Sequence, residues 1–226
     1  MTREILTRHI KQLHDEVLLL GSMVEQATFN AIATLKNRDI PTARIVLEDD
    51  ASINDKRFAI ENAVIITMAT QQPMARDLRT LTAILEIITE LERMGDYAKG
   101  IAKVTIRLAD TELPIPIRKI EQMSELGIGM LHRALSAFVN EDARMASQIP
   151  VEDDIVDALY NEIYHGLVNE MIADPRLIEP ISLLMWVVHN LERLADRVTN
   201  ICERTVFIAT GELMELDSAD DEEDDE

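Results

Sequence analysis

The sequence contains an internal repeat, and this repeat limits the possible folds more than any other feature. A shift of 103 residues aligns Asn37 with Asn140, at the first turn signal of each half. After the next turn, a shift of 100 residues places Leu91–Asp96 (LERMGD) on Leu191–Asp196 (LERLAD). The change of three residues falls at a turn, where length changes are tolerated. The chain is therefore expected to contain two copies of one folding unit, joined through residues 111–116.

Each unit should be a bundle of three long helices. In the first stretch, apolar residues recur at the helical spacings of three and four: Leu13, Val17, Leu20, Val24, Ala27, Ala31 and Leu35. Pro73 and Pro175 each fit the first turn of a helix, where a missing N–H costs nothing. The turn signals leave six helical stretches of about 40–50 Å each, at 1.5 Å per residue. Short connections favour antiparallel packing, so the predicted fold class is all-α, with two tandem, similar three-helix bundles.

The acidic residues are unevenly distributed, and their distribution predicts a tail beyond the two bundles. The whole sequence has 42 Asp and Glu against 22 Lys and Arg. Residues 215–226 contain nine acidic residues and no Lys or Arg, and such a segment cannot bury enough apolar surface to fold. We predict a first bundle over residues 1–110, a second over residues 117–212, and a disordered acidic tail over residues 213–226.

The composition also argues against several classes of protein. The formal net charge of −20 is opposite to the basic face that nucleic-acid binding requires. Cys202 is the only cysteine, so no intramolecular disulfide can form. No apolar run reaches the ~18–20 residues of a membrane-spanning helix, and the first residues lack the core of a signal peptide. We therefore expect a cytoplasmic protein that does not bind nucleic acid.

Acidic residues four positions apart occur on the second and third helices of each unit. A helical wheel places them beside the apolar stripe, where a neighbouring helix can reach them. Facing carboxylates repel one another unless a proton or a cation neutralises them, and oxygen ligands of this kind suit Mg²⁺, Mn²⁺, Fe or Zn²⁺. The candidate ligands are Asp50, Asn54, Glu92 and Asp96 in the first repeat, and Asp153, Asp157, Glu192 and Asp196 in the second.

Other interpretations of these positions stay open. Acidic residues at helical spacing are usually part of a solvated face, although the duplication of both pairs favours a built site. His189 lies on the same helix face as Glu192 and would be either a ligand or a partly exposed structural histidine; the first repeat has Thr89 there. Arg193 and Arg197 fall opposite the apolar stripe and are expected to face solvent.

Five runs of sequence, in this order, resemble the PhoU family of phosphate-uptake regulators. They are GSMVEQA (21–27), DASIN (50–54), QQPMARDLR (71–79), LERMGDYA (91–98) and NLERLADRVTNICE (190–203). The resemblance extends over residues 1–212 and leaves out the acidic tail. It implies a fold of two similar three-helix bundles and a non-enzymatic, negative regulator of phosphate uptake and phosphate-starvation signalling.

The resemblance also implies partners and cofactors. Members of the family act with a phosphate ABC transporter and, in many bacteria, with a sensor histidine kinase, so we expect the transporter's ATPase subunit and such a kinase as partners. Association with the membrane would be peripheral, through the transporter, and a homodimer is expected. Some members bind multinuclear clusters of iron, zinc or other metal ions through E/D-x-x-x-D motifs, which correspond here to the eight candidate ligands. Asn54 departs from that pattern with a neutral oxygen.

The main alternative to a regulator is a metal-dependent enzyme, either a hydrolase or a redox protein. Paired metals can activate water, so the acidic residues could support such chemistry. Against this, the sequence contains no histidine at equivalent positions of both repeats and no arrangement of a nucleophile with a base.

Overall fold

The computed structural model describes residues 2–109, 111 and 115–216, and over these residues the regular structure is entirely helical. The first repeat forms α1 (Thr2–Asn37), α2 (Ile40–Gln71) and α3 (Arg76–Arg107). The second repeat forms α4 (Ile117–Asn140), the short α5 (Ala143–Ala146) and η1 (Pro150–Glu152), α6 (Asp153–Ala173), the short η2 (Pro175–Leu177) and α7 (Ile178–Thr210). The predicted fold class, two tandem three-helix bundles, is confirmed.

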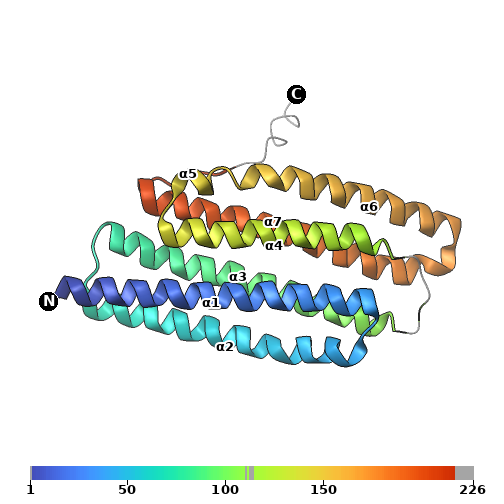
Figure 1. Ribbon diagram of the computed structural model, residues 1–226, viewed down its shortest axis with the longest axis horizontal. Coiled ribbons are helices and arrows are strands. Elements are labelled where there is room, and N and C mark those ends of the chain that lie inside the picture. Colours follow the sequence, from blue (N-terminus) through green and yellow to red (C-terminus); the bar gives the residue numbers. More distant parts are fainter. Residues whose placement is uncertain (1, 110, 112–114, 217–226) are drawn as a thin grey trace.

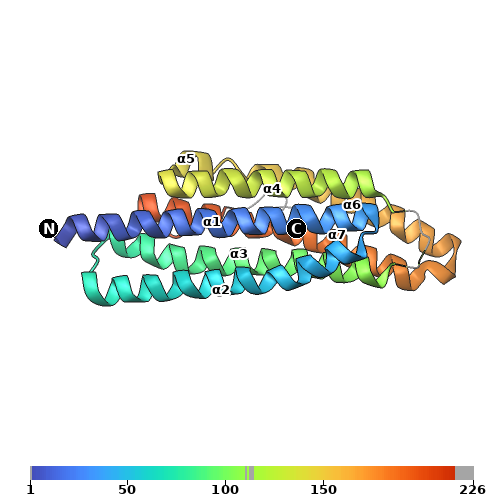
Figure 2. The same cartoon turned by 60° about the horizontal axis from the view of Figure 1, so that its bottom comes forward.

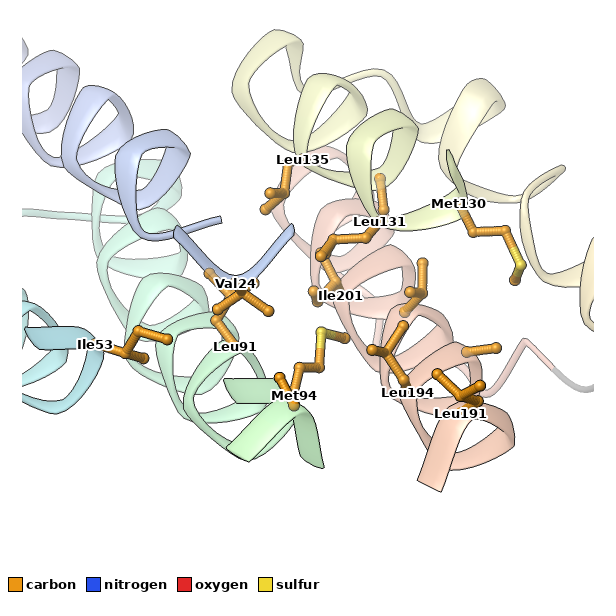
Figure 3. Packing of buried hydrophobic residues seen from close by; sticks show 14 of the residues in the cluster. Val24, Ile53, Leu91, Met94, Met130, Leu131, Leu135, Leu191, Leu194 and Ile201 are labelled. Atoms are coloured by element: carbon orange, nitrogen blue, oxygen red, sulfur yellow. The ribbon is translucent and has the colours of Figure 1, made fainter. Parts of the chain in front are cut away.

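The six long helices run roughly along one axis of an elongated molecule (Figures 1 and 2). In the first bundle α1, α2 and α3 pack against one another, and in the second α4, α6 and α7 do so. The bundles meet where α3 packs on α7 and α1 packs on α4. One continuous cluster of buried apolar side chains therefore extends through both bundles, and Figure 3 shows Met94 of α3 and Leu194 of α7 within it.

The apolar stripe of α1 is buried as its spacing predicts. Leu13, Val17, Leu20 and Val24 are at most 4% exposed, whereas Ala27 is only partly buried. Since long amphipathic helices gain most of their stability from burying one face, this stripe fixes how α1 faces α3 and α4.

The turns that follow α1 and α4 have the same construction, as the repeat requires. Arg38 and Glu141 both adopt positive φ angles, 53° and 52°. Each is followed by an aspartate whose carboxylate accepts a backbone N–H at the start of the next helix: Asp39 from Thr42, and Asp142 from Met145. Such capping aspartates stabilise helix starts by about 1 kcal/mol.

Two details of the predicted helices are wrong. Pro73 lies in the loop between Gln71 and Arg76 instead of the first turn of α3. The fifth helical stretch is interrupted at Pro150, where η1 separates α5 from α6, although α2 is continuous at the equivalent Leu47. A proline inside a helix lacks the N–H donor and clashes with the preceding turn, which explains why the two copies differ here.

Two further expectations concern membrane spans and the acidic tail. None of the helices in the described ranges has the length and apolar content that a membrane span requires. Of the predicted tail, residues 213–216 are described, and the N–H of Leu216 donates to the carboxylate of Glu203 on α7 at 3.1 Å. Residues 217–226 lie outside the described residues, so the prediction of disorder there is untested.

At the crossing of α3 and α7, Gly100 leaves room for the indole of Trp186. A Cβ on Gly100 would lie 2.0 Å from the ring, whereas a Cβ on Gly166, in α6, would meet no atom within 4 Å. We expect Gly100→Ala to push aside the Trp186 ring, which is 42% exposed, at a net cost of about 1 kcal/mol, and Gly166→Ala to stabilise the chain by up to ~1 kcal/mol through helix propensity. Urea unfolding measures both effects, and Trp186, the only tryptophan, reports the displacement by its fluorescence. A Gly100→Ala protein with unchanged stability and emission would contradict the expected clash.

Candidate functional site

The eight candidate ligands form two groups, one in each bundle. We call Asp50, Asn54, Glu92 and Asp96 the first acidic cluster, and Asp153, Asp157, Glu192 and Asp196 the second acidic cluster. Within each group, two residues come from the second long helix of the bundle and two from the third. In Figure 3, Leu191 and Leu194 mark the buried side of the α7 segment that carries Glu192. Each group lies on two helices that pack against each other, and its role as a metal site stays a prediction.

In the first acidic cluster, an amino group lies between the carboxylates. The Nζ of Lys99 is 2.6 Å from Oδ2 of Asp50 on α2 and 3.7 Å from Oδ1 of Asp96 on its own helix. Asn54 donates its side-chain N–H to the same Asp50 oxygen at 3.1 Å. The Asp50 side chain is only 7% exposed, so this buried carboxylate is neutralised by a hydrogen-bonded ammonium group.

The charged neighbours in the first acidic cluster shift the pKa values of Lys99 and Glu92. The hydrogen bond to Asp50 raises the pKa of Lys99, which keeps the amine protonated. Burial, with a smaller contribution from the charge of Asp96, raises the pKa of Glu92, and the guanidinium group of Arg57 opposes that rise. The first cluster thus combines three carboxylates with two nearby cationic side chains.

In the second acidic cluster, Asp153 occupies the position of Asp50 but has no ammonium group of the described residues bonded to it. Asp153 is 6% exposed, and its Oδ1 is buried without a hydrogen-bond partner. Burial, followed by repulsion from Asp196, Asp157 and Glu192, raises the pKa of Asp153 to about 7. A buried carboxylate oxygen without a donor is rare in a folded protein and calls for a proton or a cation.

The other acids of the second acidic cluster are perturbed in the same direction. Burial, then repulsion from Asp196 and Asp157, raises the pKa of Glu192 to about 7. Loss of hydration on its inner side also raises the pKa of Asp196, although Arg197 and Arg193 oppose this. The second acidic cluster therefore holds more negative charge than its surroundings stabilise.

His189 lies beside the second acidic cluster, as the helical wheel predicted. Its Nδ1 is 3.2 Å from Oε2 of Glu192, and its ring lies 6.2 Å from that of Tyr160. The side chain is 48% exposed, so His189 could exchange Glu192 for another partner without disturbing the core.

The carboxylates do not enclose a ready-made ion site. Across the described part of the chain, no group of three or more His, Cys, Asp or Glu side chains is placed to hold a metal ion. The oxygen donors of the second acidic cluster fit Mg²⁺, Mn²⁺, Fe or Zn²⁺ chemically, but they would have to turn toward one another to bind it. In the first acidic cluster the ammonium group of Lys99 already contacts two of the carboxylates.

Arg193 of the second hexapeptide and Arg197, which follows it, connect the bundles, contrary to the expectation that they face solvent. Arg197 donates to Glu90 of α3 at 3.2 Å, and the guanidinium group of Arg193 lies 5.7 Å from the ring centroid of Tyr97. Asn200 donates to the same Glu90 carboxylate at 3.3 Å. The wheel missed this because α7 packs against α3 as well as against α4 and α6, so a polar face can also be an interface.

Comparison with known proteins gives the same two-unit division. The family model described as PhoU domain matches residues 17–105 and again residues 120–205. A protein of Clostridium acetobutylicum named phosphate-specific transport system accessory protein PhoU homolog is 35% identical over 217 residues, covering 96% of this chain and 99% of that protein. A protein of the same name from Caulobacter vibrioides is 36% identical, covering 90% and 89% of the two chains.

Two solved structures have the same fold. The phosphate transport system regulatory protein PhoU from Streptococcus pneumoniae superposes with a TM-score of 0.86 at 31% identity, covering 92% of this chain and 99% of that one. PhoU from Pseudomonas aeruginosa also gives a TM-score of 0.86, at 29% identity, covering 91% and 99%. The likeness therefore extends over both bundles.

Proposed function

The chain belongs to the PhoU family, and on this basis we propose that it is a negative regulator of phosphate uptake and of phosphate-starvation signalling. Its relatives from Clostridium and Caulobacter are named as accessory proteins of the phosphate-specific transport system. The PhoU domain model matches residues 17–105 and 120–205, and the Clostridium relative aligns with 96% of the chain. This full-length match is the observation that carries the proposal.

The regulator would act in the cytoplasm as a helical adapter. Its partners would be the ATPase subunit of a phosphate ABC transporter and a sensor histidine kinase, with the transporter holding it at the membrane surface. The long helices offer extended faces for such contacts (Figure 1). The proposed role includes no catalytic step. The relatives' names, which describe accessory and regulatory proteins, support this.

We further propose that the second acidic cluster binds metal ions. The supporting observation is the buried Oδ1 of Asp153, which has no hydrogen-bond partner and lies near Glu192 and Asp196. A bound divalent or trivalent ion (Fe, Zn, Mn or Mg) would supply the positive charge that this group of carboxylates lacks. Binding would join α6 to α7 and so stiffen the second bundle.

Deletion of the gene and complementation test the regulatory role. In medium rich in phosphate, the deletion strain should take up phosphate faster and express a phosphate-starvation reporter that the parent strain represses. The wild-type gene should restore repression, Asp153→Ala/Glu192→Ala should restore it poorly, and Glu170→Ala, which removes an exposed charge from α6, should restore it fully. Normal repression in the deletion strain would overturn the proposed function, and full complementation by the double variant would separate regulation from the metal cluster.

A further inference from the structure

The two acidic clusters differ most at the position three residues after the last aspartate of each hexapeptide. In the first repeat this is Lys99, whose ammonium group contacts both Asp50 and Asp96. In the second repeat the equivalent residue is Thr199, which carries no charge. The repeat itself therefore supplies an internal comparison between a cluster with a built-in cation and one without.

Two further differences change the charge in the same direction. Arg57, which acts electrostatically on Glu92, is replaced by Tyr160 in the second repeat, and Asn54 is replaced by Asp157. Asn54 in the first cluster donates a hydrogen bond to Asp50, which a carboxylate at that position could not do. These three differences give the first cluster one acidic side chain fewer and two cationic side chains more than the second cluster, where Arg197, which replaces Tyr97, acts on Asp196 instead.

We propose that Lys99 takes the place of a bound cation in the first acidic cluster, so that metal binding is confined to the second acidic cluster. A metal ion entering the first cluster would have to displace an ammonium group from a carboxylate that is 7% exposed, at a hydrogen-bond distance of 2.6 Å. Bringing a second cation beside that ammonium costs electrostatic energy in a region of low dielectric. In the second cluster, by contrast, a metal ion meets Asp153 and its unpartnered oxygen.

This proposal gives the two repeats different roles. It rests on the proposed function, because it assumes that the chain binds metal. The first bundle would be complete in the absence of metal, because its counter-charge is part of the covalent chain. Only the second bundle would respond to the supply of metal. One repeat would thus have an acidic cluster with a permanent counter-charge, and the other an acidic cluster whose counter-charge depends on bound metal.

The test is to count Mn²⁺ and Zn²⁺ bound per chain by elemental analysis and equilibrium dialysis, after purification with chelator and reloading. The wild-type chain should bind metal that Glu192→Ala removes and Glu92→Ala does not. Lys99→Thr should add a second class of bound metal that Glu92→Ala removes, while Thr199→Lys should weaken binding at the second cluster at least tenfold. Lys103→Thr is the matched control, since it removes the same charge from an exposed position of α3 and should leave the count unchanged.

A second measurement does not depend on metal. In excess chelator at pH 8, Lys99→Thr should lower the urea midpoint, because Asp50 and Asp96 lose their ammonium partner, whereas Thr199→Lys should raise it. Equal loss of metal from the wild-type chain on Glu92→Ala and on Glu192→Ala would overturn this inference but leave metal binding intact. Absence of metal from every variant would overturn both this inference and the metal component of the proposed function, without affecting the regulatory role.

Discussion

Replacing Asp153 with asparagine is expected to stabilise the metal-free chain at pH 8, although the substitution removes a buried charged group. The pKa of Asp153 is about 7 in the folded chain, against 3.8 for the free side chain. Between these values the folded state holds a proton that the unfolded state has lost, so the free energy of unfolding falls as the pH rises through this window. Above pH 7 the folded chain carries the whole cost of the buried charge, at most ~4 kcal/mol for this difference in pKa.

The experiment is urea unfolding in excess chelator at pH 5 and at pH 8. The wild-type chain should be more stable at pH 5, and Asp153→Asn should remove much of this difference by gaining about 1–3 kcal/mol at pH 8, because an amide needs no proton to be neutral. Asp50→Asn is the matched control, since Asp50 occupies the same position in the first repeat.

Asp50→Asn should change the stability at pH 8 in the opposite direction. Asp50 accepts from the ammonium group of Lys99 at 2.6 Å, so its loss should cost about 1–3 kcal/mol at pH 8, as expected for a hydrogen bond to a charged group. If both substitutions destabilised the chain equally at pH 8, the contrast between the two acidic clusters would be refuted.

The second large effect is expected at Phe138, which lies in α4 and is 0% exposed. Its ring packs edge-on against His14 of α1, with ring centroids 4.9 Å apart, so it belongs to the junction between the bundles. Phe138→Ala should cost about 3–5 kcal/mol, the usual range for emptying a buried aromatic position, and should lower the melting temperature by roughly 10 °C.

Phe138→Ala should also change the pKa of His14. Burial lowers the pKa of His14, and removal of the neighbouring ring admits water, so the pKa of His14 should rise toward 6.5. Calorimetry and the NMR titration of the histidine C–H resonances measure the two effects. Phe29→Ala is the control, because that ring is 62% exposed and its loss should change stability by less than about 0.5 kcal/mol. Equal melting temperatures for the two variants would rule out a shared core between the bundles.

The fold was predictable because the information that defines it is local and is present twice. The spacing of Leu13, Val17 and Leu20 fixes the buried face of α1, and the Asp39 and Asp142 caps mark the same turn in both halves. The interruption at Pro150 was missed because the comparison of repeats emphasised what they share. A proline in one copy opposite a leucine in the other was already visible in the sequence.

The acidic clusters were only partly predictable. Helical spacing located all eight residues, but it could not show that Lys99 reaches across to α2, because contacts between helices depend on how the helices cross. The polar junction formed by Glu90 with Arg197 was also missed. Its signal is that both positions differ between the repeats, where they correspond to Asn190 and Tyr97. A contact between the two copies joins non-equivalent positions, so residues that break the repeat are candidates for it.

The alternation of residues along α7 has a mechanical consequence. Glu192 and Asp196 face α6, while the intervening Arg193 and Arg197 engage Tyr97 and Glu90 of α3. A rigid helix cannot rotate one of these faces without rotating the other. A rotation of α7 that brings its carboxylates closer to α6 would therefore move its guanidinium groups away from Tyr97 and Glu90 of α3. A change at the second acidic cluster would in this way strain the contact between the two bundles.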